Sequence, residues 1–166
     1  GLSSNDAKQE LRAELLKVIF DEDYLPKRVN KAEGVDLIRT SACNFYEDVS
    51  QKEVEQFYGS LKADGKTRPA SYGLNSKLIK INGEVKELVY KADGLYGEKI
   101  CQIIHWLSKA KQYAENGQQE KIISMLIKYY QTGDLALFDE YSIAWLKEHE
   151  GQIDFINGFI EVYGDP

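Results

Sequence analysis

The chain has 166 residues, of which 43% are apolar and 29% charged, and this balance excludes an intrinsically disordered chain. A formal charge of −6 and the absence of a basic stripe exclude a typical nucleic-acid-binding domain. No apolar run approaches the roughly 20 residues that a membrane-spanning helix needs. We therefore expect a globular domain that binds neither nucleic acid nor membrane.

Helical periodicity dominates the first third of the chain. Asn5 can cap a helix to about Phe20, with its apolar residues on one stripe. The pattern of 34–49 is ambiguous between helix and strand, and its apolar residues fit a helix better. Ser50 and Glu53 have the spacing of a capping box, which predicts a helix to about Leu61. The stretch from Ala63 to Pro69 contains Asp-Gly and predicts a loop.

A hairpin signal follows the loop. The apolar runs 78–81 and 85–89 flank Asn82-Gly83, and this dipeptide favours the positive φ values of a type I′ turn. The competing interpretation is a longer loop with irregular flanks.

Three amphipathic helices are predicted next, over 97–115, 118–131 and 134–148, with Gly133 and Gly151 as the stop signals of the second and third. Their short connections predict antiparallel neighbours. Exposed charges such as Glu115 are expected on a solvated face. The residues expected to face inward are Ile100, Ile103, Ile104, Leu107, Ala114, Ile122, Met125, Leu126, Tyr129, Leu135, Phe138, Tyr141 and Trp145.

The last stretch, 155–163, is rich in β-branched and aromatic residues and predicts a strand with a bulge at Gly158. Alternation would place Glu161 and Tyr163 on one face of this strand. A carboxylate beside a phenol suits binding of an ammonium group. The alternative is a cross-strand ion pair with an amphipathic tyrosine. Because the sequence ends soon after this apolar stretch, we expect a truncated domain.

The sequence contains no complete active site of a familiar class. His149-Glu150 lacks the second histidine of a zincin helix, and His105 is expected to be a partly buried structural residue. Two separated histidines without a cysteine pair do not predict a metal site in this chain.

Three segments, in order, resemble the dipeptidyl peptidase III family, the M49 zinc metallopeptidases. Residues 72–76 read Tyr-Gly-Leu-Asn-Ser, and 107–114 begin a similar helical stretch that continues to Gly133. Residues 158–166 resemble the family block Gly-Phe-Ile-Glu-x-Tyr-x-Asp-Pro and are the most specific of the three. The resemblance covers roughly residues 35–166.

The resemblance implies a two-lobed zinc exopeptidase that removes dipeptides from the N-termini of short peptides. Glu161 matches the glutamate that holds the peptide's α-ammonium, and Tyr163 matches the tyrosine that stabilises the oxyanion. The family's His-Glu-x-x-Gly-His zinc motif does not occur in this chain. Gly164 departs from the arginine that many members carry after the tyrosine, which leaves substrate preference open.

We therefore expect a predominantly helical α+β fold, with a helical layer, a short β-hairpin and a terminal strand, forming part of one lobe of such a peptidase. Residues 1–166 are expected to form a single partial domain, with N-terminal helices in 1–62 and the family-like segment in 70–166. The expected partners are a short peptide and the zinc-binding lobe of the same enzyme, and the expected location is the cytoplasm.

By this hypothesis, zinc belongs to the full-length enzyme, and the present chain binds none and is inactive by itself. The alternatives are a non-catalytic helical peptide-binding or scaffold module and a pseudo-peptidase.

Overall fold

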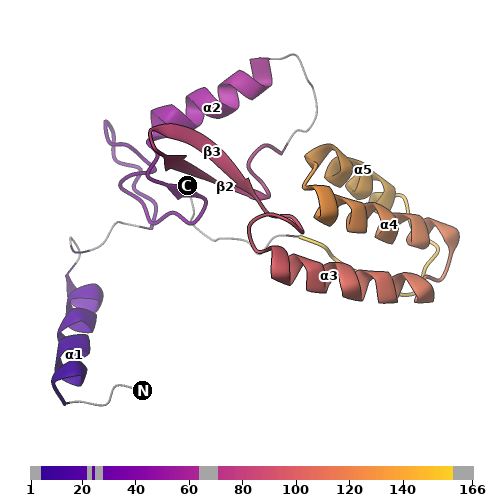
Figure 1. Ribbon diagram of the computed structural model, residues 1–166, viewed down its shortest axis with the longest axis horizontal. Coiled ribbons are helices and arrows are strands. Elements are labelled where there is room, and N and C mark those ends of the chain that lie inside the picture. The colour runs from indigo at the N-terminus through magenta and orange to yellow at the C-terminus, as the bar shows by residue number, and fades with distance from the viewer. Residues whose placement is uncertain (1–4, 22–23, 25–27, 64–70, 159–166) are drawn as a thin grey trace.

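The protein was analysed as a computed structural model that describes residues 5–21, 24, 28–63 and 71–158. In chain order, the elements are α1 (Asn5–Phe20), β1 (Tyr46–Glu47), α2 (Gln51–Ala63), β2 (Ser76–Ile81), β3 (Glu84–Val89), α3 (Gly97–Ala110), the short 3₁₀ helix η1 (Lys111–Tyr113), α4 (Gly117–Thr132) and α5 (Leu135–Leu146). Helices outnumber strands and the sheet is small, so the predicted helical α+β class is confirmed. Figure 1 shows α2 above the hairpin, α3, α4 and α5 grouped at one end, and α1 standing apart.

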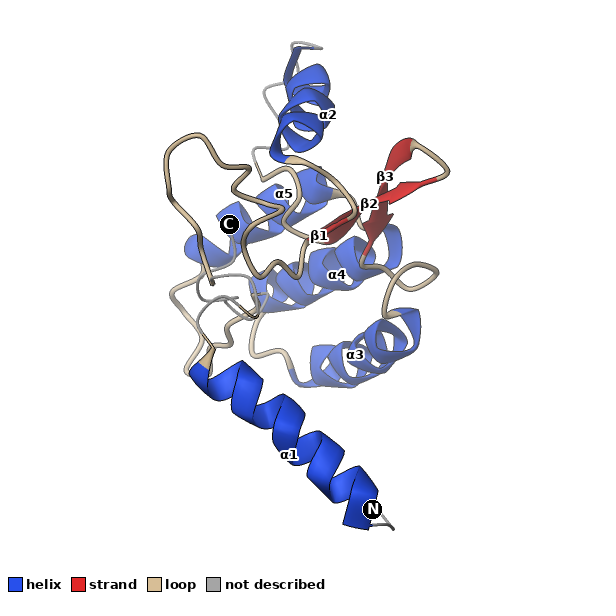
Figure 2. Ribbon diagram, turned by 90° about the vertical axis from the view of Figure 1, so that its left-hand side faces the viewer, coloured by secondary structure: helices blue, strands red, loops and turns tan. Residues whose placement is uncertain are grey.

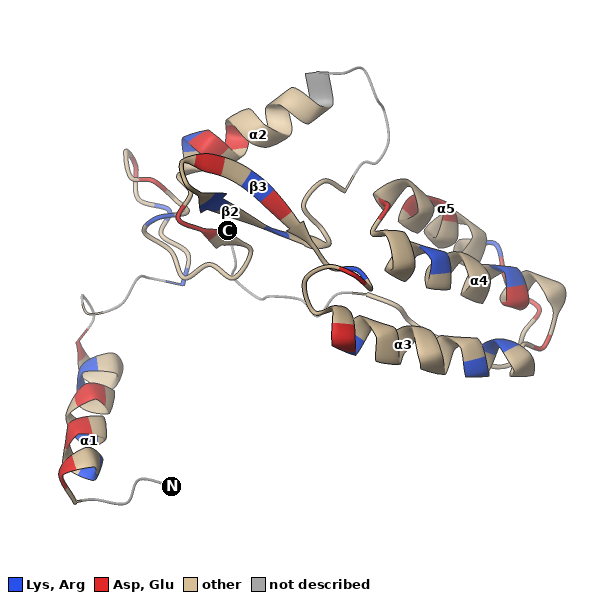
Figure 3. Ribbon diagram, in the orientation of Figure 1, with Lys and Arg blue, Asp and Glu red and all other residues tan. Residues whose placement is uncertain are grey.

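The hairpin forms where the sequence predicted it. Asn82 and Gly83 have φ values of 53° and 84°, as a type I′ turn requires. The turn pairs β2 with β3 in antiparallel register, from Ile81 opposite Glu84 to Ser76 opposite Val89. Exposure alternates along β3, with Glu84 and Lys86 on the exposed face and Glu87 on the partly buried one; Figure 3 shows the charges of this strand.

The helix expected over 34–49 is absent. The Asp36 carboxylate instead accepts hydrogen bonds from the backbone N–H groups of Ile38 (3.1 Å), Arg39 (2.9 Å) and Gln51 (3.0 Å). Such local side-chain bonds compete with a continuous helix. Farther along, Tyr46 and Glu47 form β1, which pairs in parallel with Leu78 and Ile79 of β2. The helix prediction for 34–49 was wrong because hydrogen-bond partners elsewhere in the chain determine the conformation of this segment.

The capping box of α2 is confirmed. The Ser50 backbone N–H donates to Glu53 Oε2 (2.9 Å), and the Glu53 N–H donates back to Ser50 Oγ (3.3 Å). Lys80 of β2 also forms an ion pair of 2.5 Å with Glu53. The start of α2 is thereby attached to the hairpin.

Two separate hydrophobic clusters stabilise the fold. The sheet-side cluster contains the buried Ile38, Val49, Val54 and Leu78. The helical cluster lies between α3, α4 and α5, which Figure 2 shows packed together. Its buried members are Ile100, Ile122, Leu126, Tyr129, Tyr130 and Tyr141, and Leu107, Met125, Phe138 and Trp145 pack against them.

The Tyr-Gly-Leu-Asn-Ser element joins the two clusters. Gly73 has a φ of 80°, and a Cβ there would come within 2.9 Å of the Tyr58 hydroxyl. Asn75 Nδ2 donates to the carbonyl of Gly133 (2.9 Å), and the Asn75 carbonyl accepts from Tyr90 N–H (2.7 Å). Ser76 Oγ donates to Glu87 (2.6 Å). The motif thus connects the hairpin to the end of α4.

Helix boundaries differ from the prediction by a few residues. The first predicted helix of the group ends at Ala110 and continues as η1, while Asn116 caps α4 by accepting from Gln119 N–H. Gly133 ends α4 in the left-handed conformation, as expected. The Asp134 side chain caps α5 by accepting from Ala136 N–H. The last helix ends at Leu146, two residues before the predicted Glu148.

Candidate functional site

The two predicted site residues, Glu161 and Tyr163, lie outside the described residues. The structure therefore neither places them nor brings them together. It describes the approach to them, residues 151–158, and the surfaces against which that stretch packs. Of the strand expected over 155–163, residues 155–158 have no strand structure and the others fall outside the described part.

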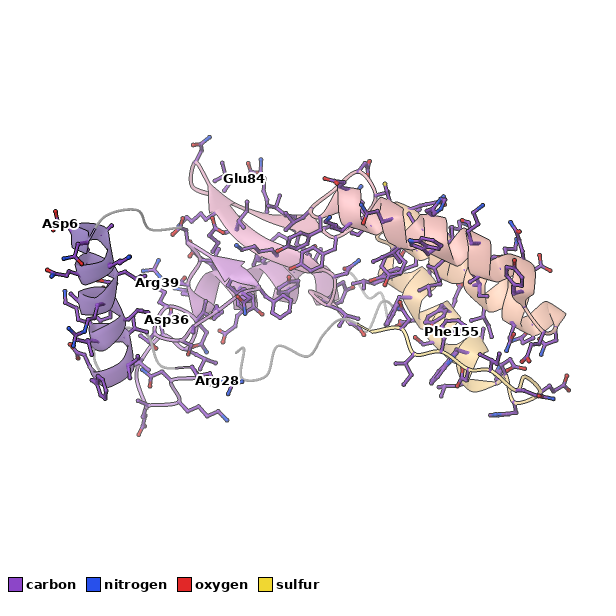
Figure 4. All side chains as sticks on the ribbon, turned by 90° about the horizontal axis from the view of Figure 1, so that it is seen from below. Asp6, Arg28, Asp36, Arg39, Glu84 and Phe155 are labelled. Atoms are coloured by element: carbon purple, nitrogen blue, oxygen red, sulfur yellow. The ribbon has the colours of Figure 1, made fainter. Side chains whose placement is uncertain are left out.

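The approach stretch runs beside the helices and is bound to them by side chains. Figure 4 labels Phe155 on this stretch, and Phe155 packs against the helical cluster. Trp145 Nε1 of α5 donates to Asp154 Oδ1 (2.9 Å). The Tyr130 hydroxyl of α4 donates to Asn157 Oδ1 (2.7 Å). These bonds place the start of the family block beside α4 and α5.

Glu115 and Gln119 bind the beginning of the same stretch. Glu115 Oε2 accepts from the backbone N–H groups of Gln152 (2.6 Å) and Ile153 (3.1 Å). The buried Gln119 donates from Nε2 to the Ile153 carbonyl (2.8 Å). A Cβ at Gly151 would come within 2.2 Å of that Nε2, so only glycine fits there without displacement. Glu115 is exposed, as predicted, but its carboxylate also binds the backbone of the approach stretch.

A cavity of about 700 Å³ lies at Gly158. Tyr90, Tyr96, Ile100 and Ile103 form its apolar part, and the rings of Tyr90 and Tyr96 are 5.3 Å apart. Tyr96 has a φ of 59°, an uncommon conformation for a tyrosine, and directly precedes α3 without a capping hydrogen bond from its side chain. The cavity has room for an apolar or aromatic side chain beside Gly158.

Two lysines add positive charge to this cavity. Lys77 is paired with Glu47, while Lys99 of α3 makes no ion pair with any described residue.

A second, more apolar cavity of about 470 Å³ lies under the approach stretch. Leu107, Ile123 and Leu126 line it from the helices, and Ile153 and Ile156 line it from the stretch. Glu115 is the one charged residue among the described residues that line it.

Burial raises the pKa of several tyrosine hydroxyls in the helical cluster. Burial raises the pKa of Tyr130, although the hydrogen bond to Asn157 acts in the opposite direction. Burial also raises the pKa of Tyr141 to about 12. These tyrosines therefore stay protonated, and Tyr130 acts as a hydrogen-bond donor and not as a base.

The described part of the chain holds no group of three His, Cys, Asp or Glu side chains that could bind a metal ion. His105 is exposed on α3 against Trp106, so its expected burial was wrong, and His149 is exposed too. The described residues therefore do not fit a zinc site. That the chain alone binds no zinc stays a prediction.

Among the described helices, none combines the length and apolar character needed to cross a membrane.

A comparison with protein families shows which family the chain belongs to. The model of peptidase family M49 matches residues 31–166. The chain belongs to peptidase family M49. The match includes the described approach stretch and the block that carries Glu161 and Tyr163. This confirms the resemblance seen in the sequence.

A solved structure of DPP III from Caldithrix abyssi is similar to this M49 chain, with a TM-score of 0.49 and 16% sequence identity. The similarity covers 90% of this chain and 27% of the other, so the chain spans about a quarter of the length of that protein. No curated protein sequence matches the chain.

The sequence did not predict that four residues bind the approach stretch through their side chains, namely Glu115, Gln119, Tyr130 and Trp145. Periodicity marks such residues as helical or apolar, but it does not reveal that their polar atoms reach residues 9 to 38 positions away. The only local signal was Gly151, which was interpreted as a helix stop.

Proposed function

We propose that this chain is part of a zinc-dependent dipeptidyl-peptidase that removes dipeptides from the N-termini of short peptides. The observation that carries the proposal is the M49 family match over 31–166, which includes the Gly158–Pro166 block. By this proposal, the chain binds the substrate N-terminus and supplies the oxyanion-stabilising tyrosine. In this proposal, zinc and the residues that would hold it belong to the full-length protein.

Glu161 is the residue proposed to hold the free α-ammonium of the peptide. A carboxylate forms charge-assisted hydrogen bonds with an ammonium group, and these are stronger than neutral ones. A peptide with a blocked N-terminus would leave this carboxylate without its partner, and such a mismatch is strongly rejected by a polar site. Specificity for free N-termini follows from this contact.

Tyr163 is proposed to donate its hydroxyl hydrogen to the oxygen that becomes negative in the tetrahedral transition state. Such a donor accelerates the reaction because it stabilises charge that is absent in the bound substrate. Its loss is therefore expected to lower kcat with little change in KM.

The cavity at Gly158 supports a peptide as the substrate. Its tyrosines and isoleucines offer apolar surface at Gly158, which precedes Glu161 by three positions in the sequence. We propose that it takes the side chain of one of the first peptide residues.

The test is dipeptide release from a short peptide by the full-length zinc-loaded protein, compared between wild type, Tyr163→Phe and Glu161→Gln. Tyr163→Phe is expected to lower kcat by about 100-fold or more. Glu161→Gln is expected to raise KM and to reduce the preference for free over N-acetylated peptides. Peptide binding without dipeptide release by the wild type would support the non-catalytic alternative, and equal cleavage of blocked peptides would contradict the role of Glu161.

A further inference from the structure

Residues 152–157 have no helix or strand among them, and yet they are attached to the helices at three successive points. Glu115 and Gln119 bind the backbone of Gln152 and Ile153, and Trp145 binds Asp154. Tyr130 binds Asn157, which is the last described side chain before Gly158. These bonds satisfy polar groups of a segment that has no ladder of its own, and they add to the packing of Phe155 against the helical cluster.

Tyr130 differs from the other residues that bind this stretch because it also contacts the loop after β3 and the cavity at Gly158. Its side chain is buried in the helical cluster, and its carbonyl accepts from Ala92 N–H (3.0 Å), in the loop that follows β3. Its ring also lines the cavity at Gly158. A single residue of α4 therefore connects the loop after the sheet, the cavity and the end of the approach stretch.

We propose that Tyr130 is a positioning residue for the reaction, acting through Asn157 on the placement of Glu161 and Tyr163. The proposal rests on the proposed function of those two residues. Glu161 follows Asn157 by four positions, a span of at most about 14 Å, so the Tyr130–Asn157 bond fixes the point from which the chain continues to both proposed site residues. Small displacements matter, since a misplacement of about 1 Å can cost on the order of 100-fold in rate.

The Tyr130–Asn157 bond allows a design that separates positioning from stability. Tyr130→Phe removes the donor and leaves Asn157 Oδ1 without it. Asn157 Nδ2 is itself buried without a hydrogen-bond partner among the described residues. Replacing both members of a buried polar pair by apolar groups of similar shape is close to neutral for stability, whereas removing one is costly. The double variant Tyr130→Phe/Asn157→Leu therefore recovers stability without restoring the bond.

The experiment compares wild type, Tyr130→Phe and the double variant in the full-length zinc-loaded protein. Dipeptide release, thermal unfolding and hydrogen exchange of peptides covering 152–163 are measured. Tyr113→Phe, which removes a hydroxyl from an exposed ring, is the matched control.

We expect Tyr130→Phe to lower kcat/KM by about tenfold or more, with a lower kcat and a higher KM because both site residues shift. Tyr163→Phe, by contrast, should change kcat alone. The rate of amide hydrogen exchange in peptides covering 152–163 should rise by roughly fivefold in both Tyr130 variants. The double variant should unfold near the wild-type temperature and still turn over slowly.

Recovery of both stability and kcat/KM in the double variant would overturn the positioning role, as would unchanged kinetics in Tyr130→Phe. A wild type that releases no dipeptides would refute the proposed function instead. In that case the exchange measurement still decides whether Tyr130 holds the stretch, and unchanged exchange would refute that as well.

Discussion

Two helices of 16 residues, α1 and α4, have opposite relations to the rest of the molecule. Six residues of α4 are buried, whereas no residue of α1 is buried and every large apolar side chain from Leu11 to Phe20 is at least 44% exposed. Both sequences nevertheless predict an amphipathic helix. The difference shows that periodicity identifies a helix and its apolar stripe, but not whether another element covers that stripe.

The largest effect expected from this difference concerns a pair of leucines. Leu126 of α4 is 1% exposed and Leu15 of α1 is 47% exposed. Leu126→Ala should lower the free energy of unfolding by about 2–5 kcal/mol, because it removes buried apolar contacts and leaves a cavity. Leu15→Ala should change it by no more than about 0.5 kcal/mol. Urea unfolding followed by circular dichroism measures both, and equal losses would mean that α1 is covered in solution.

The second effect concerns the glycine that ends α4. Gly133 has a φ of 70°, and a Cβ there would come within 2.5 Å of Val89 Cγ1. Gly133→Ala should therefore cost about 1–3 kcal/mol, from the left-handed conformation and the contact with the hairpin. Gly59→Ala is the matched control, since this glycine lies inside α2 and a Cβ there meets nothing within 4 Å. It should raise stability by about 0.5–1 kcal/mol, and a loss at Gly59 as large as at Gly133 would contradict the assignment.

The smallest effect concerns α2, which is held to the hairpin by charge. Hydrogen bonds from Lys80 and Ser50 lower the pKa of Glu53 from 4.5 to about 2. Because the pKa is depressed in the folded state, the associated stability is present above about pH 4.5 and is lost as the pH falls toward 2. Thermal unfolding between about pH 5 and pH 2.5 should therefore show a steeper loss for wild type than for Glu53→Gln. Parallel profiles for the two proteins would exclude this linkage.

Local signals predicted the elements that depend on neighbouring residues. Asn82-Gly83 forms the expected turn, Ser50 and Glu53 form the capping box, and Gly133 ends α4. In each case, the physical cause lies within a few residues of the effect.

The prediction failed where the partner is distant. The turn at Asp36 depends on Gln51, and β1 depends on its pairing with Leu78 and Ile79. Neither contact is visible in the apolar pattern of 34–49, which is compatible with a helix. The chain satisfies its backbone groups by whichever partner the folded structure supplies.

The candidate site divides in the same way. The sequence alone determined that Glu161 and Tyr163 have the order and spacing of the M49 block, because a motif is a property of adjacent residues. Only the tertiary structure decided that Tyr130 of α4 binds Asn157, 27 positions away. A hydrogen bond requires two groups within about 3 Å, and the packing of the approach stretch against the helical cluster brings these two together where no sequence spacing does.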